Sequence, residues 1–205
     1  MEQARASIDG GHPSHGEDEN LLARIAAGEQ AALTRLVERH GRGLRLFASR
    51  YLGNAADAED VAQDVFVSVW KHAGRYDAGK GRATTWLYRI AANRCIDLRR
   101  WRGLRIFIGL DEAPEQPAPE PQADIGLGAR QELAMVRDGL SRLPERQRMA
   151  LLLRAAGDLD VPAIAAVMGT SAGSVEQLLV RARRSLRDRM QDANAGARKP
   201  EKAGS

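Results

Sequence analysis

Two adjacent helical patterns of opposite surface charge, within residues 57–100, constrain the fold of this chain more than any other feature. In each pattern the apolar residues recur every three or four positions, so they form one stripe of an amphipathic helix. The first stripe comprises Ala58, Val61, Ala62, Val65, Phe66, Val69, Trp70 and Ala73, and the second comprises Leu87, Ile90, Ala91, Cys95 and Leu98. The first helix is mainly acidic on its outer face and the second is rich in arginine. The pair therefore predicts one face that docks a protein and one that docks a nucleic acid.

The remaining patterns are also helical, so the sequence predicts an all-α fold. Helices are expected over residues 21–27, 30–40, 44–52, 130–142, 144–156, 161–168 and 171–190. No alternating apolar and polar run is long enough for a strand. Gly53-Asn54 suits a helix stop. The short helix at 161–168, the turn at Gly169-Thr170 and the longer helix that follows have the layout of a helix-turn-helix.

A proline-rich acidic segment divides the chain into two small helical domains. Residues 110–124 contain four prolines and five acidic residues but no basic residue, a composition typical of an extended linker. We therefore expect domains at 19–103 and 128–191, joined by a flexible linker at 104–127. Residues 1–18 are predicted to be a disordered leader and residues 192–205 a disordered tail, because neither has an apolar stripe.

Composition limits the cellular setting and the mode of nucleic-acid binding. Cys95 is the only cysteine, so no internal disulfide is possible, and its place on an apolar stripe predicts a buried side chain. No signal peptide or membrane-spanning stretch is recognised, so we expect a soluble, cytoplasmic protein without membrane insertion. The formal charge of +4 is small for a protein that grips DNA alone. A larger partner is expected to supply much of the binding.

The segments EDVAQDVF (59–66) and TTWLYRIAANRCIDLRR (84–100) resemble region 2 of bacterial sigma factors of the extracytoplasmic-function class. The resemblance implies that Asp60, Gln63 and Asp64, beside Phe66, contact the coiled coil of the largest RNA polymerase subunit. It also implies that the helix and its preceding loop capture a base of the melted minus-10 element. The residues suited to that role are Lys80, Arg82, Thr84, Thr85, Trp86, Arg89, Asn93 and Arg94. The alternatives are a merely solvated acidic face, and packing of Trp86 and Tyr88 on a neighbouring helix.

The segments at 140–154 and 164–187 resemble sigma region 4, whose second helix reads the minus-35 element in the major groove. On that helix the apolar residues form one buried stripe, which comprises Val175, Leu178, Leu179, Ala182 and Leu186. The outward residues are Ser174, Gln177, Arg181 and Arg184. Glutamine reads adenine and arginine reads guanine or clamps phosphate. The run Glu176-Gln177-Leu178 departs from the family's usual pattern, so more weight falls on Arg181 and Arg184. A solvated helix face is the alternative.

The resemblance implies a sigma factor that binds core RNA polymerase, directs promoter-specific initiation and is held inactive by an anti-sigma factor. It also implies that Ala83 and Thr84, where primary sigma factors carry aromatics, give weaker duplex melting. The acidic linker would lie in the RNA channel or act as a simple tether. We find no catalytic motif, metal-ligand set or cofactor motif, so no enzymatic activity is expected. Two alternatives stay open: a polymerase-independent helix-turn-helix regulator, and a decoy that binds polymerase or an anti-sigma factor without reading DNA.

Overall fold

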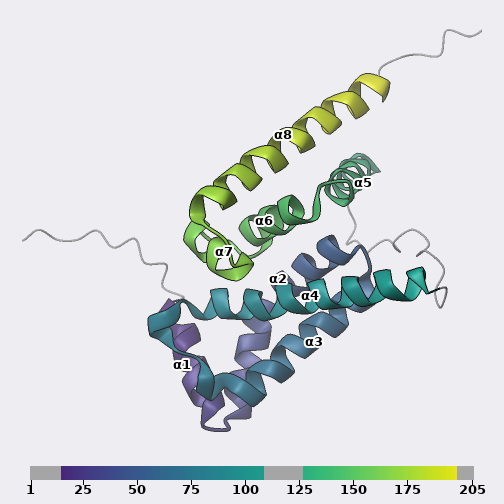
Figure 1. Cartoon of the computed structure of the whole chain (residues 1–205). Helices are drawn as coiled ribbons and strands as arrows, with labels where there is room; N and C mark the ends of the chain where they lie inside the picture. Colours follow the sequence, from purple (N-terminus) through teal and green to yellow (C-terminus); the bar gives the residue numbers. More distant parts are fainter. Residues whose placement is uncertain (1–14, 109–126, 198–205) are drawn as a thin grey trace, which may run out of the picture.

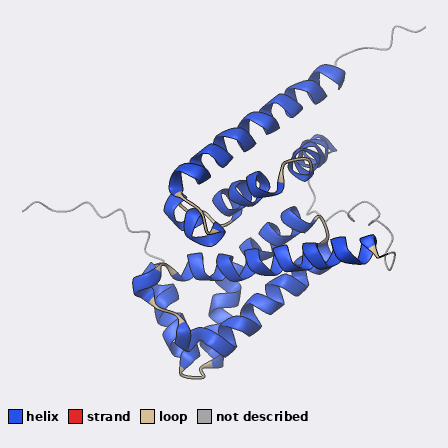
Figure 2. Ribbon diagram, viewed as in Figure 1, coloured by secondary structure: helices blue, strands red, loops and turns tan. Residues whose placement is uncertain are grey.

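The computed structural model describes residues 15–108 and 127–197, and every regular element in those ranges is a helix (Figure 1, Figure 2). This confirms the all-α prediction. The N-terminal unit contains α1 (His15–Ala26), α2 (Gln30–Leu52), α3 (Ala55–His72), the short 3-10 helices η1 (Ala73–Arg75) and η2 (Ala78–Lys80), and α4 (Ala83–Phe107). The C-terminal unit contains α5 (Leu127–Ser141), α6 (Glu145–Ala156), α7 (Val161–Met168) and α8 (Ala172–Ala197). Most of the predicted leader, linker and tail lies outside the described residues.

Local capping groups set several helix ends. Gly53 ends α2 in the left-handed conformation at φ 75°, which glycine adopts without steric cost. The Asn54 side chain then caps α3 by accepting a 3.1 Å hydrogen bond from the Asp57 backbone N–H. Asp160 caps α7 in the same way, and Gly169 ends that helix at φ 60°. The bounds of α7 are those predicted from the sequence.

Helix α1 begins at His15, so the prediction that residues 1–18 form a leader is wrong for its last four residues. The physical reason is Asp18, whose side chain is buried. Its carboxylate accepts a 2.7 Å hydrogen bond from Arg39 Nε and lies 2.8 Å from His40 Nε2. These contacts attach the first turn of α1 to α2.

The prediction of separate helices at 30–40 and 44–52 is also wrong, because α2 is continuous from Gln30 to Leu52. Gly41 and Gly43 lie in the interval between the two predicted helices, and both are inside α2. A Cβ atom at Gly43 would lie 2.8 Å from the Tyr88 hydroxyl oxygen. Gly43 therefore allows α4 to approach α2 closely, and it does not end the helix.

The predicted starts of the linker, at residue 104, and of the tail, at residue 192, need correction as well. Helix α4 continues to Phe107, so residues 104–107 are helical and do not belong to the linker. Arg102 forms an ion pair with Asp57 of α3, which holds this extension against the N-terminal unit. At the other end of the chain, α8 continues to Ala197 and includes the start of the predicted tail.

The two units pack against each other, with α2 against α6 and α4 against α7 (Figure 1). The Tyr51 hydroxyl donates a 2.7 Å hydrogen bond to Glu145 of α6. Arg148, only 6% exposed, donates to the backbone carbonyl of Tyr51 at 3.2 Å and to those of Ser141 and Leu143. One buried cation thereby joins α2 to the turn between α5 and α6.

Within the described ranges, no single helix has the length and apolar composition needed to cross a membrane. Only the pair Val161–Met168 and Ala172–Gln191, bent by 101°, meets those two criteria when it is joined.

Candidate nucleic-acid interface

A pocket of about 170 Å³ lies between the loop that follows η1 and the first turns of α4. It brings together five of the eight predicted minus-10 residues: Lys80, Arg82, Thr85, Trp86 and Arg89. Three of them are basic, and Trp86 is a half-buried aromatic. The pocket therefore combines a stacking surface with cationic donors, the two features that a single-stranded nucleic acid requires.

Tyr76 also lines this pocket, and the sequence interpretation missed it. Its ring centroid lies 5.7 Å from that of Trp86, with 48° between the ring planes. Its hydroxyl donates a 2.9 Å hydrogen bond to the Gly81 carbonyl, which closes the loop on itself. The aromatic at position 76, ten residues before Trp86, was the available sequence signal.

The loop has its own internal bonds. The Asp77 carboxylate accepts a 2.9 Å hydrogen bond from the Gly79 backbone N–H and lies 3.3 Å from Lys80 Nζ. The Gly79 hydrogen bond, followed by the Lys80 interaction, lowers the pKa of Asp77. Gly81 has φ 141°, a conformation that L side chains rarely adopt. The loop geometry therefore depends on Gly81 as well as on the acidic residue.

The other three predicted minus-10 residues do not line this pocket. Thr84 faces the cleft between the two units. Asn93 and Arg94 are exposed farther along α4. Arg94 lies 3.7 Å from Asp64 of α3, which connects the predicted DNA-binding set to the predicted polymerase-binding set.

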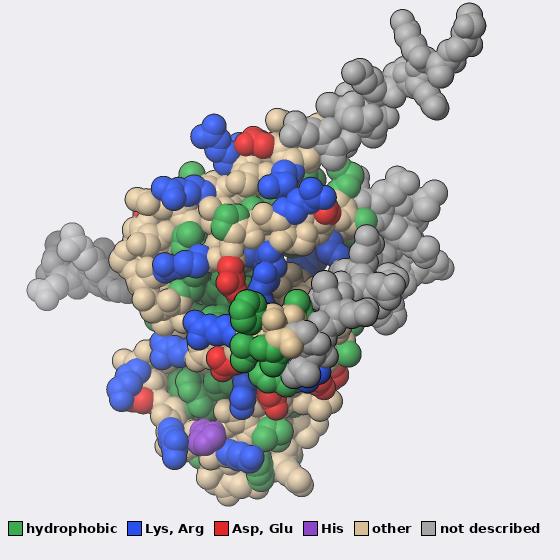
Figure 3. Space-filling view, turned by 45° about the vertical axis from the view of Figure 1, so that its right-hand side comes forward, with side chains coloured by type: hydrophobic (Ala, Val, Ile, Leu, Met, Phe, Trp, Pro, Cys, Tyr) green, Lys and Arg blue, Asp and Glu red, His purple; other side chains and the backbone are tan. Residues whose placement is uncertain are grey.

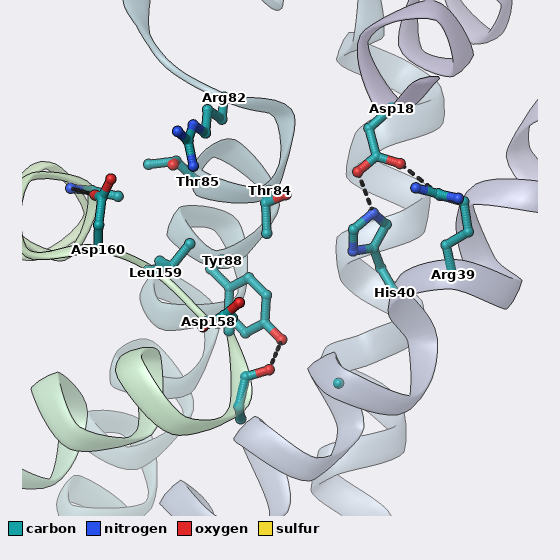
Figure 4. A pocket seen from close by; sticks show the side chains of 14 residues that line it. Asp18, Arg39, His40, Arg82, Thr84, Thr85, Tyr88, Asp158, Leu159 and Asp160 are labelled. Atoms are coloured by element: carbon teal, nitrogen blue, oxygen red, sulfur yellow. Dashed lines mark hydrogen bonds and ion pairs between the residues drawn. The ribbon is translucent and has the colours of Figure 1, made fainter. Parts of the chain in front are cut away.

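The interdomain cleft, of about 570 Å³, places part of the minus-10 set opposite the C-terminal unit (Figure 4). Arg82, Thr84 and Thr85 line one wall, and Asp158 and Asp160 line the other. The turn between α6 and α7 therefore lies over residues predicted to meet DNA.

Two hydrogen bonds from α4 join the N-terminal unit to the C-terminal unit. Tyr88 donates to the Ala156 carbonyl at 2.7 Å (Figure 4). Arg89 donates to the Ala166 carbonyl of α7 at 3.2 Å. A predicted minus-10 residue is therefore engaged by the C-terminal unit in this arrangement.

The outer face of α8 has a simpler construction. Val175, Leu179 and Ala182 are buried beneath it, which confirms that the helix packs through the predicted stripe. Gln177 and Arg181 are exposed and, among the described residues, make no hydrogen bond or ion pair.

Two other predicted minus-35 residues of α8 have local partners. Ser174 is half-buried and lies 2.9 Å from the Ser171 hydroxyl. Arg184 is exposed and lies 3.9 Å from Asp188. The structure therefore places all four predicted residues on one side of one helix, at spacings of three and four residues.

The four residues of α3 that were predicted to bind polymerase differ in their solvent exposure. Asp60, Gln63 and Asp64 are exposed, whereas Phe66 is buried and only 8% exposed. Trp70, predicted to share the apolar stripe of this helix, is 39% exposed, and Val67 is exposed as well. Both side chains line a groove between α2 and α3.

That groove, of about 490 Å³, is mainly apolar. Leu33, Val37, Phe66, Val67 and Trp70 line it, and Gln63 lies at its margin. Spacings of four and three residues put Gln63, Val67 and Trp70 on one side of α3, and this was the signal that could have identified the surface.

A second exposed apolar surface lies at the C-terminal end of α4 (Figure 3). Its members are Trp101, Leu104, Ile106, Phe107 and Ile108. Phe107 is 87% exposed, and the Arg105 guanidinium lies 4.5 Å from the centroid of the Trp101 ring. The sequence interpretation had assigned most of these residues to the linker.

Comparisons with known proteins assign both units. Residues 36–105 match the family Sigma-70 region 2, and residues 133–186 match Sigma-70, region 4. The RNA polymerase sigma factor NccH of Alcaligenes xylosoxydans xylosoxydans is 35% identical over 82% of this chain and 92% of its own length. The ECF RNA polymerase sigma factor RpoE of Cereibacter sphaeroides is 34% identical over 79% of this chain and 88% of its own.

A solved structure, CnrH in complex with the cytosolic domain of CnrY, has a TM-score of 0.65 to this chain at 32% identity. The match covers 86% of this chain and 98% of the CnrH chain. The helix order, the two matched regions and these relatives all indicate the same protein family. The chain therefore belongs to the sigma-70 family of RNA polymerase sigma factors, in the extracytoplasmic-function class.

Proposed function

We propose that this protein binds core RNA polymerase and directs initiation at promoters whose minus-10 and minus-35 elements its two units read. The observation that supports this proposal is the presence, on one chain, of two separate surfaces whose exposed side chains suit DNA binding. The pocket beside Trp86 offers aromatic and basic side chains, and the outer face of α8 offers exposed arginines. A third surface, on α3, is acidic with an apolar groove beside it.

The pocket beside Trp86 is proposed to receive a base of the melted minus-10 strand. An aromatic ring supplies a stacking surface for an unstacked base, and basic residues at the rim attract the backbone phosphates. Tyr76 contacts one edge of Trp86, so the indole is held in place before DNA arrives. Lys80 and Arg82 are exposed on the loop at the rim.

The α3 surface is proposed to bind a basic helix pair of the polymerase. Asp60, Gln63 and Asp64 would steer the encounter by charge, whereas Val67 and Trp70 would provide the buried contact. Tryptophan is among the residue types that most often contribute strongly to protein interfaces. We include Val67 and Trp70 in this surface in place of the buried Phe66.

The α8 face is proposed to enter the major groove at the minus-35 element. Arg181 and Arg184 would bind guanine edges or phosphates, and Gln177 would read adenine. Glu176 is exposed on the same helix and would be repelled by phosphate, which limits how the helix lies in the groove.

An anti-sigma factor is proposed to hold the chain inactive in the cytoplasm until a signal releases it. The related CnrH forms a complex with the cytosolic domain of CnrY, which supports a protein partner of this kind. The chain itself would not catalyse any reaction, since the polymerase performs nucleotide addition.

A polymerase-independent DNA-binding regulator is the second candidate function. The observation that favours it is the open α8 face in an arrangement where the minus-10 residues lie partly beneath the C-terminal unit. Such a protein would bind duplex DNA through α8 alone.

Run-off transcription and a gel shift, each with and without core polymerase, distinguish the two functions. The sigma-factor proposal requires that the chain plus core enzyme yields promoter-specific transcripts and that the tight duplex complex needs core enzyme. A tight and specific complex formed by the chain alone, without any transcript on adding core enzyme, would support the regulator.

A further inference from the structure

We propose that Glu19, on helix α1, is a positioning residue for minus-10 recognition, because it holds both the loop and the first turn of α4 that form the pocket. The inference rests on the proposed minus-10 function of that pocket. Glu19 does not line the pocket, so its role would be indirect. It was not identified from the sequence.

The first contact of Glu19 is with the start of α4. The first N–H groups of a helix have no partner within that helix and need an external acceptor. Arg82, at the N-cap position, provides no side-chain hydrogen bond. Glu19 Oε1 accepts a 3.1 Å hydrogen bond from the Ala83 backbone N–H instead. A carboxylate 64 residues away in sequence thereby caps the helix that carries Thr85, Trp86 and Arg89.

This cap also suits the electrostatics of the helix. A helix N-terminus carries partial positive charge, which a nearby carboxylate stabilises. Ala83 is 1% exposed, so water has little access to its N–H group. Loss of the Glu19 carboxylate would leave a buried donor unsatisfied at the turn that aims Trp86.

The second contact of Glu19 is with the loop. The Tyr76 hydroxyl lies 3.3 Å from Glu19 Oε1 and 2.9 Å from the Gly81 carbonyl oxygen, so its single proton is shared between two acceptors. Burial, with the Glu19 carboxylate as the next contribution, raises the pKa of Tyr76 to about 12, which keeps the hydroxyl protonated at neutral pH. Glu19 is thereby connected through Tyr76 to the ring of Trp86.

Helix α1 can act as a firm support because the preceding residue fixes it. Asp18 is 3% exposed and binds Arg39 and His40 of α2. The carboxylate of the next residue, Glu19, does not contact α2 in this way but contacts the loop and α4. One turn of α1 therefore joins the helical bundle to the candidate base pocket.

The two oxygens of the Glu19 carboxylate have different surroundings. Glu19 Oε2 is buried and, among the described residues, has no hydrogen-bond partner. The contacts of this carboxylate within the described residues therefore run through Oε1, to Ala83 and to Tyr76. Both contacts hold the pocket in a binding-ready geometry.

The test uses the full chain with core polymerase and promoters that differ by single bases in the minus-10 or the minus-35 element. The variants are Glu19→Ala and Glu19→Gln, with Glu17→Ala as the matched control. Glu17 lies on the same helix, is exposed and pairs only with Arg39. For each variant the measured quantity is the ratio of transcripts from the preferred and the altered promoter.

Glu19→Ala should lower the minus-10 discrimination ratio by roughly fivefold, the effect expected from loss of one helix cap. The minus-35 ratio and binding to core polymerase should not change. Glu19→Gln keeps an acceptor oxygen and should restore most of the ratio, and Glu17→Ala should match the wild type.

The proposal is overturned if Glu19→Ala lowers transcription equally at every minus-10 variant, because that result shows a general structural role. If Glu19→Ala does not fold, Tyr76→Phe decides the matter, since it removes the second contact and keeps the ring against Trp86. Unchanged minus-10 discrimination in Tyr76→Phe would then refute the proposal. Absence of transcription by the wild-type chain would instead refute the proposed function.

Discussion

The two surfaces that we propose bind DNA are built in different ways. The outer face of α8 belongs to a single helix, and its geometry follows from the apolar residues on the opposite side of that helix. The pocket beside Trp86 draws on a loop, on the first turns of α4 and on Glu19 of α1. A surface on one helix is encoded locally, whereas a pocket between elements depends on contacts distant in sequence.

The surfaces also differ in their accessibility. In this arrangement the α8 face is open, whereas Arg89 is bonded to α7 and Thr84 and Thr85 face the turn between α6 and α7. The proposed reading of duplex DNA by α8 therefore requires no rearrangement of the two units. Contact of a melted strand with Thr84, or with Arg89 released from the Ala166 carbonyl, would require that the C-terminal unit moves away from α4.

The largest expected effect concerns the open surface. Replacing both Arg181 and Arg184 with alanine should reduce promoter-dependent transcription by roughly a hundredfold, because each base or phosphate contact contributes about 1–3 kcal/mol. Binding to core polymerase should stay at the wild-type level. Arg183→Ala, at an exposed position between them, is the matched control and should have little effect. Loss of core binding in the double variant would show that α8 serves a different partner.

A smaller effect is expected for the pocket. Trp86→Ala should reduce opening of the minus-10 element by about tenfold, since stacking of one base on an aromatic ring contributes about 1–3 kcal/mol. Trp86→Phe keeps a stacking ring and should recover much of the loss. Permanganate reactivity of minus-10 thymines measures the open strand. Trp101→Ala, at an exposed position near the other end of α4, should leave the signal unchanged.

The contact between the units can be weakened through Gly43. Alanine is more favourable than glycine inside a helix by about 1 kcal/mol, so helix propensity alone predicts that Gly43→Ala stabilises α2. Its Cβ, however, would lie 2.8 Å from the Tyr88 hydroxyl oxygen and would displace it from the Ala156 carbonyl. We therefore expect no gain in the free energy of unfolding and a larger radius of gyration by small-angle scattering.

Tyr88→Phe provides the control for that experiment. It removes the hydroxyl and costs about 1 kcal/mol for one hydrogen bond. In this background Gly43→Ala should become stabilising, because the obstructing atom is absent. Equal effects of Gly43→Ala in both backgrounds would mean that the Tyr88 hydroxyl does not restrict α2.

The smallest effect is confined to acid conditions. Burial opposes ionisation of Asp18, but the hydrogen bonds and charges of His40 and Arg39 outweigh it and lower the pKa of this carboxyl. Its contribution to stability is therefore complete above the ordinary Asp pKa of about 3.9 and is lost as the pH falls through the lowered folded-state value. The free energy of unfolding should decline below about pH 4 more steeply in the wild type than in Asp18→Asn. Parallel pH profiles would exclude this linkage.

The sequence predicted those parts of the molecule that depend on near neighbours. The bounds of α7, the buried stripe of α8 and the division into two helical units follow from periodicity and from turn residues such as Gly169. Five minus-10 residues converge on one pocket because they belong to a single loop and the helix that follows it. These interactions span only a few residues.

The missed features depend on distant partners. Gly43 lies inside α2, and its neighbour in space is Tyr88, 45 positions later, so local spacing did not show why a glycine stands there. Asp18 was assigned to the leader, since its partners lie 21 and 22 residues away. The partners of Glu19 lie 57 and 64 residues away, so its contacts were missed as well. Trp70 fits a helical stripe by spacing, and only the shape of the groove between α2 and α3 leaves it exposed.

Tyr88 lies between glycines from both units. Its hydroxyl oxygen would be 2.8 Å from a Cβ at Gly43, and its ring atom Cε1 would be 3.1 Å from a Cβ at Gly157. A chimaera that exchanges the C-terminal unit for that of a relative should therefore keep glycine at the end of α6, since a Cβ there would force the Tyr88 ring to shift by a few tenths of an ångström.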